Sequence, residues 1–249
     1  MTAIRVVDLE TTGLDPVDHR VIEIGWCDLV TDRVGRAGDP IDWLVSERHH
    51  GNMLVNPGRP IPPESSAVHH LIDADVRKAG TWRDAAAISF ADMTESHPIV
   101  AFCAHNIKFE RQWCTDDLIG TRPWICTYKC ALRLWPDAPS HSNQALRYWR
   151  NPTGLDRNIA SVAHRAWPDA YVTAFLLRDM LNAGTSVETL VEWSSQPALT
   201  VRCHVGKFRG QPWADVEIGF LRWMLDKDFD EDTLFSVRHE IEKRAGAQT

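Results

Sequence analysis

The segment IRVVDLE, at residues 4–10, joins an apolar run to two carboxylates, and this junction constrains the fold more than any other part of the sequence. The run favours a buried β-strand, in which side chains at positions i and i+2 point to the same face. Asp8 and Glu10 therefore share a face at the strand end. Two buried like charges are unfavourable unless a cation neutralises them. The pattern predicts a pocket for positive charge, although Asp-x-Glu alone more often lies on a solvated strand edge.

Strand and helix patterns alternate along the rest of the main domain, after an initial hairpin. VIEIGWCDLV, at 21–30, alternates like a second strand, a third extended segment is expected near 42–45, and PIVAFCAHN, at 98–106, is typical of a buried strand. One predicted helix begins at Pro63 or Glu64. Further helices are predicted over 81–96, 107–118, 142–149, 168–181 and 187–194, and another follows a short strand within 124–135. This order predicts an α/β domain with a mixed sheet flanked by helices.

A small carboxy-terminal module is expected after this domain. A Gly-Thr-Ser turn marks the domain end, so we divide the chain into a domain at 1–185, a linker at 186–199 and a module at 200–249. The module has the pattern of a strand, a glycine turn and two helices, which predicts a small α+β fold.

The module also offers basic and aromatic residues. Lys207, Arg209 and Arg222, together with Trp213, could form a face that binds a nucleic-acid strand on an aromatic platform. The aromatic residues are better explained as the core of the small fold, and the role of the basic residues stays open.

The composition is that of an ordinary globular protein, with 44% hydrophobic and 24% charged residues in a chain of 249. No run approaches the roughly 18 apolar residues that span a bilayer. The start of the chain lacks a signal-peptide pattern, so we expect a cytoplasmic protein without membrane contacts. The six cysteines lack paired Cys-x-x-Cys spacing, which favours reduced, buried thiols over a zinc site. The net charge of −7 does not exclude a polyanionic partner, because two bound Mg²⁺ ions would bring it to −3.

A second acidic pattern, HRAWPD at 164–169, stands far along the chain. Trp167 precedes a proline and is biased away from helical backbone. We therefore expect His164 on a loop and Asp169 in the first turn of a helix that Pro168 opens at its first position. Loop and helix could then present an imidazole and a carboxylate to one site. The alternative is an aspartate that stabilises the helix N-terminus, beside an incidental surface histidine.

Taken together, the acidic segments resemble a known family. Their order and spacing are similar to the three motifs of the DnaQ-like 3′→5′ exonucleases, DEDDh branch, and the matching residues are Asp8, Glu10, Asn106, Phe109, the acid at 110, His164 and Asp169. VNPGRPIPPESSAVHHLIDADV also resembles the family's segment between the first two motifs, so the similarity covers about residues 3–182. WICTYKCALRLWPDAPSHSNQAL and VGKFRGQPWADVEIGFLRWML resemble the exodeoxyribonuclease X branch and its carboxy-terminal module. The resemblance implies a ribonuclease H-like mixed sheet.

The resemblance also implies a set of catalytic roles. Asp8, Glu10 and Asp169 would hold the first of two Mg²⁺ or Mn²⁺ ions, with Asp8 bridging to the second. Glu110 would support the second ion through water, and His164 would be the general base. The chemistry is consistent with these residue types. Two cations about 4 Å apart clamp the attacking and leaving oxygens of a phosphodiester, carboxylate oxygens suit Mg²⁺ or Mn²⁺, and an imidazole can accept the proton of a water.

Further residues are candidates for substrate binding. Thr11, Thr12, Gly13 and Leu14 follow the first carboxylates and could hold the terminal nucleotide, or they could form only a tight turn. Asn106 is expected to order the site or contact the strand, and Phe109 either stacks on a base or joins the core. His105 is expected to be structural.

The family position at 110 is normally aspartate, and here it is Glu110. We expect activity to be retained, with an altered metal preference at the second site. The sequence thus predicts a two-metal 3′→5′ exodeoxyribonuclease that releases nucleoside 5′-monophosphates from DNA 3′ ends, single-stranded or frayed, in DNA repair or processing. Polymerase or repair proteins are candidate partners. The alternatives are an exoribonuclease of the same superfamily and a catalytically weakened binding module.

Overall fold

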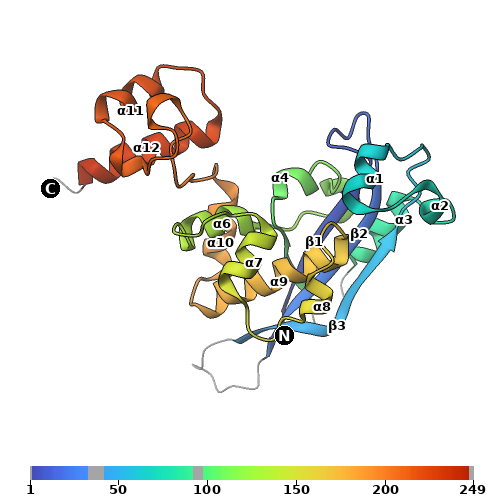
Figure 1. Cartoon of the computed structure of the whole chain (residues 1–249). Helices are drawn as coiled ribbons and strands as arrows, with labels where there is room; N and C mark the ends of the chain where they lie inside the picture. The colour runs from blue at the N-terminus through green and yellow to red at the C-terminus, as the bar shows by residue number, and fades with distance from the viewer. Residues whose placement is uncertain (1, 33–41, 92–97, 247–249) are drawn as a thin grey trace.

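The computed structural model describes residues 2–32, 42–91 and 98–246, in which a five-stranded sheet lies between helices (Figure 1). The strand order is β3-β2-β1-β4-β5. The first three strands are antiparallel neighbours, whereas β4 runs parallel to β1 and β5 parallel to β4. Their bounds are β1 (Ala3–Thr11), β2 (Val21–Asp32), β3 (Asp42–Leu54), β4 (Ile99–Ala104) and β5 (Trp124–Cys126). The predicted α/β fold with a mixed sheet is confirmed.

β1 is buried because its two faces contribute to two different cores. Ile4 and Val6 belong to one hydrophobic cluster, and Val7 and Leu9 belong to another. This is the period-two alternation of a strand that is covered on both sides. The same alternation carries the acidic pair at positions 8 and 10 onto the face of Ile4 and Val6. The carboxylates therefore lie on the side of the sheet that packs against α9 (Ala166–Asn182).

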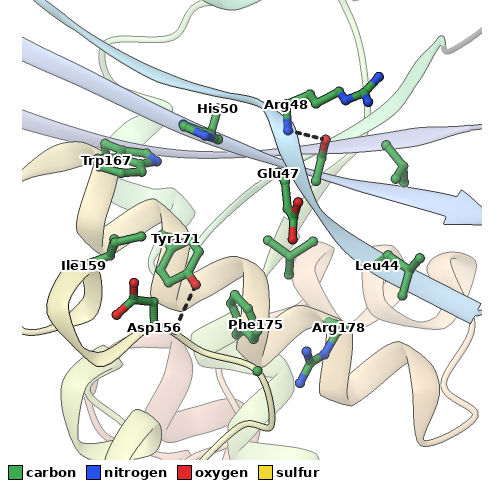
Figure 2. A pocket seen from close by; sticks show the side chains of 14 residues that line it. Leu44, Glu47, Arg48, His50, Asp156, Ile159, Trp167, Tyr171, Phe175 and Arg178 are labelled. Atoms are coloured by element: carbon green, nitrogen blue, oxygen red, sulfur yellow. Dashed lines mark hydrogen bonds between the residues drawn. The ribbon is translucent and has the colours of Figure 1, made fainter.

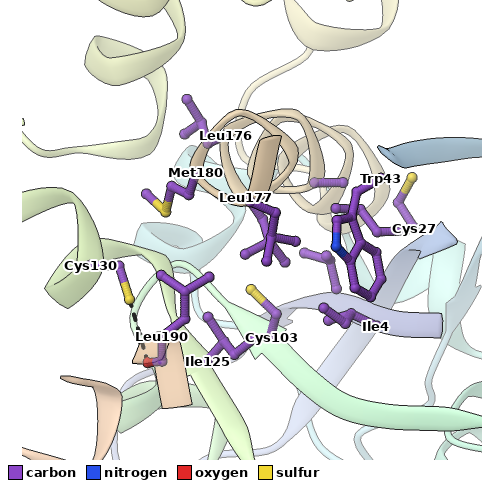
Figure 3. Packing of buried hydrophobic residues seen from close by; sticks show 14 of the residues in the cluster. Ile4, Cys27, Trp43, Cys103, Ile125, Cys130, Leu176, Leu177, Met180 and Leu190 are labelled. Carbon is purple, nitrogen blue, oxygen red and sulfur yellow. Dashed lines mark hydrogen bonds between the residues drawn. The ribbon is translucent and has the colours of Figure 1, made fainter. Parts of the chain in front are cut away.

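α9 is the main helix of the first core, as Figure 3 shows. Leu176, Leu177 and Met180 are fully buried in the same cluster as Ile4 and Cys103 of the sheet. α6 (Thr127–Leu134), α7 (Asn143–Arg150) and α8 (Arg157–Ala160) pack on α9, and α10 (Val187–Ser195) packs on α6 and β5. Since each fully buried aliphatic side chain contributes about 1.5–3 kcal/mol, this packing fixes α9 firmly on the sheet.

The second core holds the other face of the sheet and the helices that precede and follow β4. α3 (Trp82–Ser89) contributes Ala85 and Ala86, and α5 (Asp116–Ile119) contributes Ile119. The remaining helices of this part are α1 (Pro63–His69), α2 (Asp73–Val76) and α4 (Ile107–Glu110). Pro63 is the first residue of α1, as predicted.

Two predicted helices differ in length from those observed. The helix predicted over 81–96 ends at Ser89, and residues 92–97 lie outside the described residues. The single helix predicted over 107–118 was wrong, because the chain forms α4 and α5 instead. α4 ends at Glu110, and Thr115 begins α5 as its N-cap, with extended backbone (φ −81°, ψ 151°) and a carbonyl that accepts the N–H of Ile119.

The carboxy-terminal module has a hydrophobic cluster of its own, formed by residues between Cys203 and Ile241. It consists of the 3₁₀ turns η1 (Gly206–Phe208) and η2 (Trp213–Asp215) and the helices α11 (Ile218–Leu225) and α12 (Glu231–Gly246). The strand predicted at its start is reduced to one bridge between Arg202 and Pro212. Trp213 is 5% exposed and its Nε1 donates to the carbonyl oxygen of Thr200 (2.8 Å), which favours the core role over the stacking role.

The connection between the two parts is also helical. Leu190 of α10 is fully buried in the core of the sheet domain, so the residues of α10 pack with that domain. The division of the chain at 185 and 199 stays a prediction. All six cysteines are buried and unpaired, as expected. Among the described residues, no helix has both the length and the apolar character to cross a membrane.

Candidate active site

β1 ends in the predicted acidic pair, which is partly exposed. Glu10 pairs with Glu23 of β2 in the antiparallel register. Burial, followed by the charges of Asp169 and Glu10, raises the pKa of Asp8 well above its usual range. Burial and then the charge of Asp169 raise the pKa of Glu10 to about 8. A divalent cation would relieve this accumulation of negative charge at the strand end.

The conformation of His164 sets the start of α9 beside this strand end. His164 has a φ of 58°, a left-handed backbone that is uncommon outside glycine, and Arg165 is the extended N-cap. The helix includes Trp167, so the prediction that Trp167 breaks it and Pro168 opens it was wrong. A proline fits in the first turn because the N–H groups there have no intrahelical acceptor. The expected outcome is nevertheless confirmed, with His164 before the helix and Asp169 in its first turn.

A close approach between β2 and α9 brings the two motifs together. Gly25 pairs with Asp8 in the sheet. A Cβ atom on Gly25 would lie 2.0 Å from the backbone nitrogen of Trp167 and 2.1 Å from the carbonyl carbon of Ala166. Only a glycine leaves room for the helix backbone at this position. The missing side chain therefore allows the first turn of α9 to rest on the strand next to Asp8.

Three carboxylates converge at this point. Asp8, Glu10 and Asp169 each place an oxygen within 4.8 Å of the other two. Asp169 is held by two hydrogen bonds, from the backbone N–H of His164 to Oδ2 (2.7 Å) and from Gln144 Nε2 to Oδ1 (3.0 Å). The His164 side chain is exposed at the edge of this group. The donor set, oxygen only and acidic, suits a hard divalent cation such as Mg²⁺ or Mn²⁺.

Glu110, at the end of α4, lies beside this group rather than within it. The residue is 4% exposed, its Oε2 has no hydrogen-bond partner, and burial raises its pKa to about 8. Its charge contributes to the raised pKa of Asp8, after burial, Asp169 and Glu10. A buried carboxylate oxygen without a partner is a feature that a second cation would explain. Its assignment to the second metal stays a prediction.

Comparison with known proteins identifies the family. A family model described as an exonuclease, of the RNase T type, matches residues 6–177, a range that contains every one of these carboxylates and His164. The chain belongs to the RNase T family of exonucleases. Exodeoxyribonuclease 10 of Escherichia coli K12 is 30% identical over 250 residues, which are 96% of this chain and 99% of that protein. The predicted membership of the DnaQ-like exonucleases, and with it an enzymatic function as a phosphodiester hydrolase, is confirmed.

A solved structure supports the fold of this RNase T family member. Exonuclease X in complex with 5′ overhanging duplex DNA is 30% identical, with a TM-score of 0.57, and the match covers 77% of this chain and 99% of that chain. A DNA polymerase III subunit epsilon-like protein of Rhodobacter capsulatus is 32% identical over 149 residues, 57% of this chain and 19% of that protein. The expected ribonuclease H-like sheet is thus confirmed.

The residues predicted to contact substrate after β1 lie in a loop, and the threonine hydroxyl groups of this loop form hydrogen bonds with its own backbone. Thr11 Oγ1 donates to the carbonyl oxygen of Gly13 (2.6 Å), and Thr12 Oγ1 accepts from the N–H of Arg20 (2.9 Å). Leu14 is 77% exposed. The threonines are therefore held as parts of the loop, and Leu14 is free to contact a ligand. The substrate roles of all four residues stay predictions.

The residues around α4 differ in accessibility. Asn106 is exposed, whereas Phe109 is half-buried and packs edge-on against Trp113, with ring centroids 6.3 Å apart. His105 donates from Nε2 to the carbonyl oxygen of His141 (2.8 Å), and burial lowers the pKa of His105 to about 4. A neutral, hydrogen-bonded histidine fits the structural role expected for it, while the contacts of Asn106 and Phe109 with substrate stay predictions.

Several residues that shape the RNase T site were not found from the sequence. Gln144 fixes Asp169, Gly25 admits α9, and Glu23 binds Arg165. The alternation of VIEIG would have placed Glu23 and Gly25 on the face of Asp8, because register partners across a sheet share a face. No comparable signal in the sequence points to Gln144.

A cavity of about 760 Å³ lies next to the start of α9, between β3 and the segment from α8 to α9 (Figure 2). His50 and Trp167 stack in it with ring centroids 5.0 Å apart, and Tyr171 accepts a hydrogen bond from the N–H of Asp156 (3.0 Å). None of the predicted site residues lines this cavity. Trp167 connects the two places, since its backbone rests on Gly25 and its ring lines the cavity.

Proposed function

We propose that this chain is a two-metal-dependent 3′→5′ exodeoxyribonuclease that releases nucleoside 5′-monophosphates. The convergence of Asp8, Glu10 and Asp169 within 4.8 Å, next to His164, carries the proposal. It occurs in a chain that is similar along nearly its whole length to an exodeoxyribonuclease. The carboxylates and the imidazole would each have a role in the hydrolysis of a phosphodiester.

The carboxylates would hold the ions. Asp8, Glu10 and Asp169 would hold the first ion, Asp8 would also serve the second, and Glu110 would support the second through water. When bound, the two ions neutralise the acidic group and stabilise the charge that develops on the attacking and leaving oxygens. The raised pKa values of Glu10 and Glu110, both about 8 and both caused first by burial, support this reading because bound cations would stabilise the charged forms of these two carboxylates.

His164 would be the general base. Its side chain is exposed at the edge of the acidic group, while its backbone N–H is fixed to Asp169 Oδ2. The imidazole can thus reach the nucleophilic water and take its proton, while the backbone stays in place. Thr11, Thr12, Gly13, Leu14, Asn106 and Phe109 would line the path of the terminal nucleotides. Of these, Leu14 and Asn106 have the exposure that contact with a base or sugar requires.

DNA is the substrate that the relatives favour. The similar proteins include exodeoxyribonuclease 10 and an exonuclease X bound to overhanging duplex DNA. We therefore propose single-stranded or frayed DNA 3′ ends as substrate. We place the activity in the cytoplasm, in DNA repair or processing, with polymerase or repair proteins as candidate partners, a setting that the similarity to an epsilon-like polymerase subunit supports.

Digestion of matched oligonucleotides tests the proposal. DNA and RNA of the same sequence, single- and double-stranded and labelled at either end, are incubated with the protein in Mg²⁺ and in Mn²⁺. We expect mononucleotide release from the 3′ end of DNA. Preferred cleavage of RNA would indicate an exoribonuclease, and no cleavage with either ion would contradict the assignment.

The variant His164→Ala separates an enzyme from a binding module. A general base contributes about 10²–10⁴-fold to a rate, so we expect turnover to fall by about that factor while the dissociation constant for DNA stays the same. Equal turnover in the variant and the wild type would contradict the role of His164.

A further inference from the structure

A fifth carboxylate, Glu23 of β2, lies behind the acidic group and is 1% exposed. It pairs with Glu10 across the sheet, on the face that packs against α9. Its partners come from two directions. Arg165 donates from Nε to Oε2 (2.9 Å) and from Nη2 to Oε1 (2.7 Å). The N–H of Ala166 donates to Oε2 (3.1 Å), and Asn52 Nδ2 donates to Oε1 (3.0 Å).

These contacts exclude Glu23 as a further metal ligand. Each of its two oxygens already accepts two hydrogen bonds, and the arginine supplies the countercharge. A carboxylate oxygen has about two lone-pair sites, so no site is left for a cation. Bidentate pairing with an arginine also fixes the orientation of both groups. Glu23 is therefore satisfied by the protein, in contrast to Glu110, whose Oε2 has no partner.

Glu23 contacts the chain at the start of α9, between two residues of the proposed catalytic group. Arg165 is the N-cap of α9 and Ala166 is its first residue. His164 directly precedes them, and Asp169 follows within the same helical turn. The contact thus lies between the proposed general base and the third metal ligand. On the same face of β2, Gly25 leaves room for the backbone of α9, and Glu23 accepts a hydrogen bond from its first residue.

We propose that Glu23 is a positioning residue that binds Arg165 and the N-terminus of α9, and so holds His164 and Asp169 against Asp8 and Glu10. This inference rests on the function proposed above. Without the carboxylate of Glu23, the first turn of α9 would keep its hydrophobic packing but lose the polar contact that sets its depth on the sheet. Asp169 would then share the ion less closely with β1, and His164 would lose its alignment.

The chain contains a matched control for this contact. Arg5 and Asp28 form another buried, bidentate pair between β1 and β2, with both nitrogen–oxygen distances at 2.8 Å. Arg5 also donates to the carbonyl oxygens of Ser89 and Ala91, far along the chain from the α9 N-terminus. Asp28→Asn therefore perturbs another buried carboxylate–arginine pair on the same strand, β2, without touching the acidic group.

The experiment compares Glu23→Gln with Asp28→Asn and the wild type. The readouts are kcat and KM on a 3′-terminal DNA substrate, melting temperature, and Mn²⁺ affinity by titration calorimetry without nucleic acid. Loss of a residue that orients a metal ligand typically changes affinity or activity about 10–100-fold. We expect Glu23→Gln to lower kcat and Mn²⁺ affinity by about that factor with little change in KM, whereas Asp28→Asn lowers only the melting temperature.

Each outcome decides the inference. If Glu23→Gln matches Asp28→Asn in kcat and Mn²⁺ affinity, Glu23 only stabilises the fold and the inference is overturned. If the wild type degrades no nucleic acid but its Mn²⁺ affinity still falls in Glu23→Gln and not in Asp28→Asn, the positioning role stands and the proposed function fails. Should Glu23→Gln not fold, Arg165→Lys keeps the charge, removes the planar fork and is expected to lower the same two quantities.

Discussion

At the scale of single residues, the acidic side chains differ in how far the protein alone satisfies them. Asp169 is fixed by two hydrogen bonds, whereas Glu110 is buried with one oxygen unpartnered. The sequence could predict both as metal ligands through the resemblance to the family motifs. It could not show this difference, because Gln144 approaches from a distant helix without any pattern of its own. The unsatisfied group is also the one that departs from the family's usual aspartate.

The variant Glu110→Asp tests the effect of that departure. The shorter side chain withdraws the carboxylate by about 1.5 Å, one carbon–carbon bond, inside a closed pocket. We expect the wild type to favour Mn²⁺ relative to the variant, because Mn²⁺ tolerates less regular coordination than Mg²⁺. The ratio of initial rates in the two ions should therefore shift several-fold toward Mg²⁺ in Glu110→Asp.

Glu110→Gln is the control, since it keeps the shape and removes the charge. It should reduce the rate in both ions without restoring the preference for Mg²⁺. An unchanged ratio in Glu110→Asp would show that position 110 does not set the metal preference.

The pKa values of Glu10 and Glu110 predict how the stability of the metal-free protein depends on pH. Both are raised by burial from 4.5 to about 8. Between these values the folded state binds more protons than the unfolded state, so the free energy of unfolding decreases as pH rises from about 5 to about 8. We expect the melting temperature of EDTA-treated protein to fall by several degrees across this range, as measured by circular dichroism. Excess Mg²⁺ should reverse the fall at pH 8, because bound cations stabilise the ionised carboxylates.

Glu110→Gln removes one of the two titrating groups, so the melting temperature of the metal-free variant should change less with pH than that of the wild type. A melting temperature that rises with pH in the metal-free wild type would contradict the raised pKa values.

At the scale of secondary structure, long periodic segments were predictable and their junctions were not. The apolar run of β1 and the apolar residues of α9 fixed those elements and the side of the sheet on which the acids lie. The break before α9 was expected at Trp167, but it lies at His164, and the modest enrichment of histidine in left-handed backbone is too weak a signal to place it. The single helix expected over 107–118 divides into α4 and α5, because residues 111–115 leave the helical path while Trp113 and Cys114 are buried in the second core. Tertiary packing overrode local preference at both junctions.

The variant Gly25→Ala tests the junction between β2 and α9. Its Cβ atom would overlap the backbone of Ala166 and Trp167, at 2.0–2.1 Å, and backbone cannot move aside as a flexible side chain can. We expect a loss of about 1–3 kcal/mol in the free energy of unfolding, as for other overpacked positions. Because α9 must lift from the strand, activity should fall further than stability explains, measured as kcat at a temperature where the variant is fully folded.

Gly219→Ala is the matched control, because Gly219 lies in α11 with open space around its Cβ position. Alanine is the better helix former, so this variant should be as stable as the wild type or more so. Normal turnover in folded Gly25→Ala would show that the close approach of α9 is not needed for the site.

At the scale of the whole molecule, the sheet domain holds the whole acidic group, and the carboxy-terminal module (α11 and α12 in Figure 1) has a hydrophobic cluster of its own. Trp213 is buried, in agreement with the preferred core role of the aromatic residues, so any strand-binding face must use other residues. Arg209 and Arg222 are exposed, and Lys207 is exposed beside Glu217 (3.4 Å). The sequence could not separate these cases, since an aromatic residue in a small module fits both a core and a surface.

Deletion of residues 200–249 tests the contribution of the module. The deletion leaves Asp8, Glu10, Asp169 and His164 in place, together with α10, whose Leu190 is buried in the main core. We expect kcat on a short DNA substrate to stay close to that of the full chain. The dissociation constant for a longer strand should rise about tenfold or more, because a second linked binding surface raises the overall affinity.

Fluorescence anisotropy with labelled DNA of two lengths measures the dissociation constants, and single-turnover experiments on the same substrates measure the rates. In the full chain, Arg209→Ala combined with Arg222→Ala should reproduce part of the loss for the longer strand and leave the short substrate unaffected. Equal affinity of the deleted and full chains for the longer strand would exclude the module from DNA binding. A loss of rate on the short substrate would instead show that the module supports the sheet domain. The two parts touch where Arg133 of α6 lies 5.7 Å from the ring centroid of Phe235 in α12.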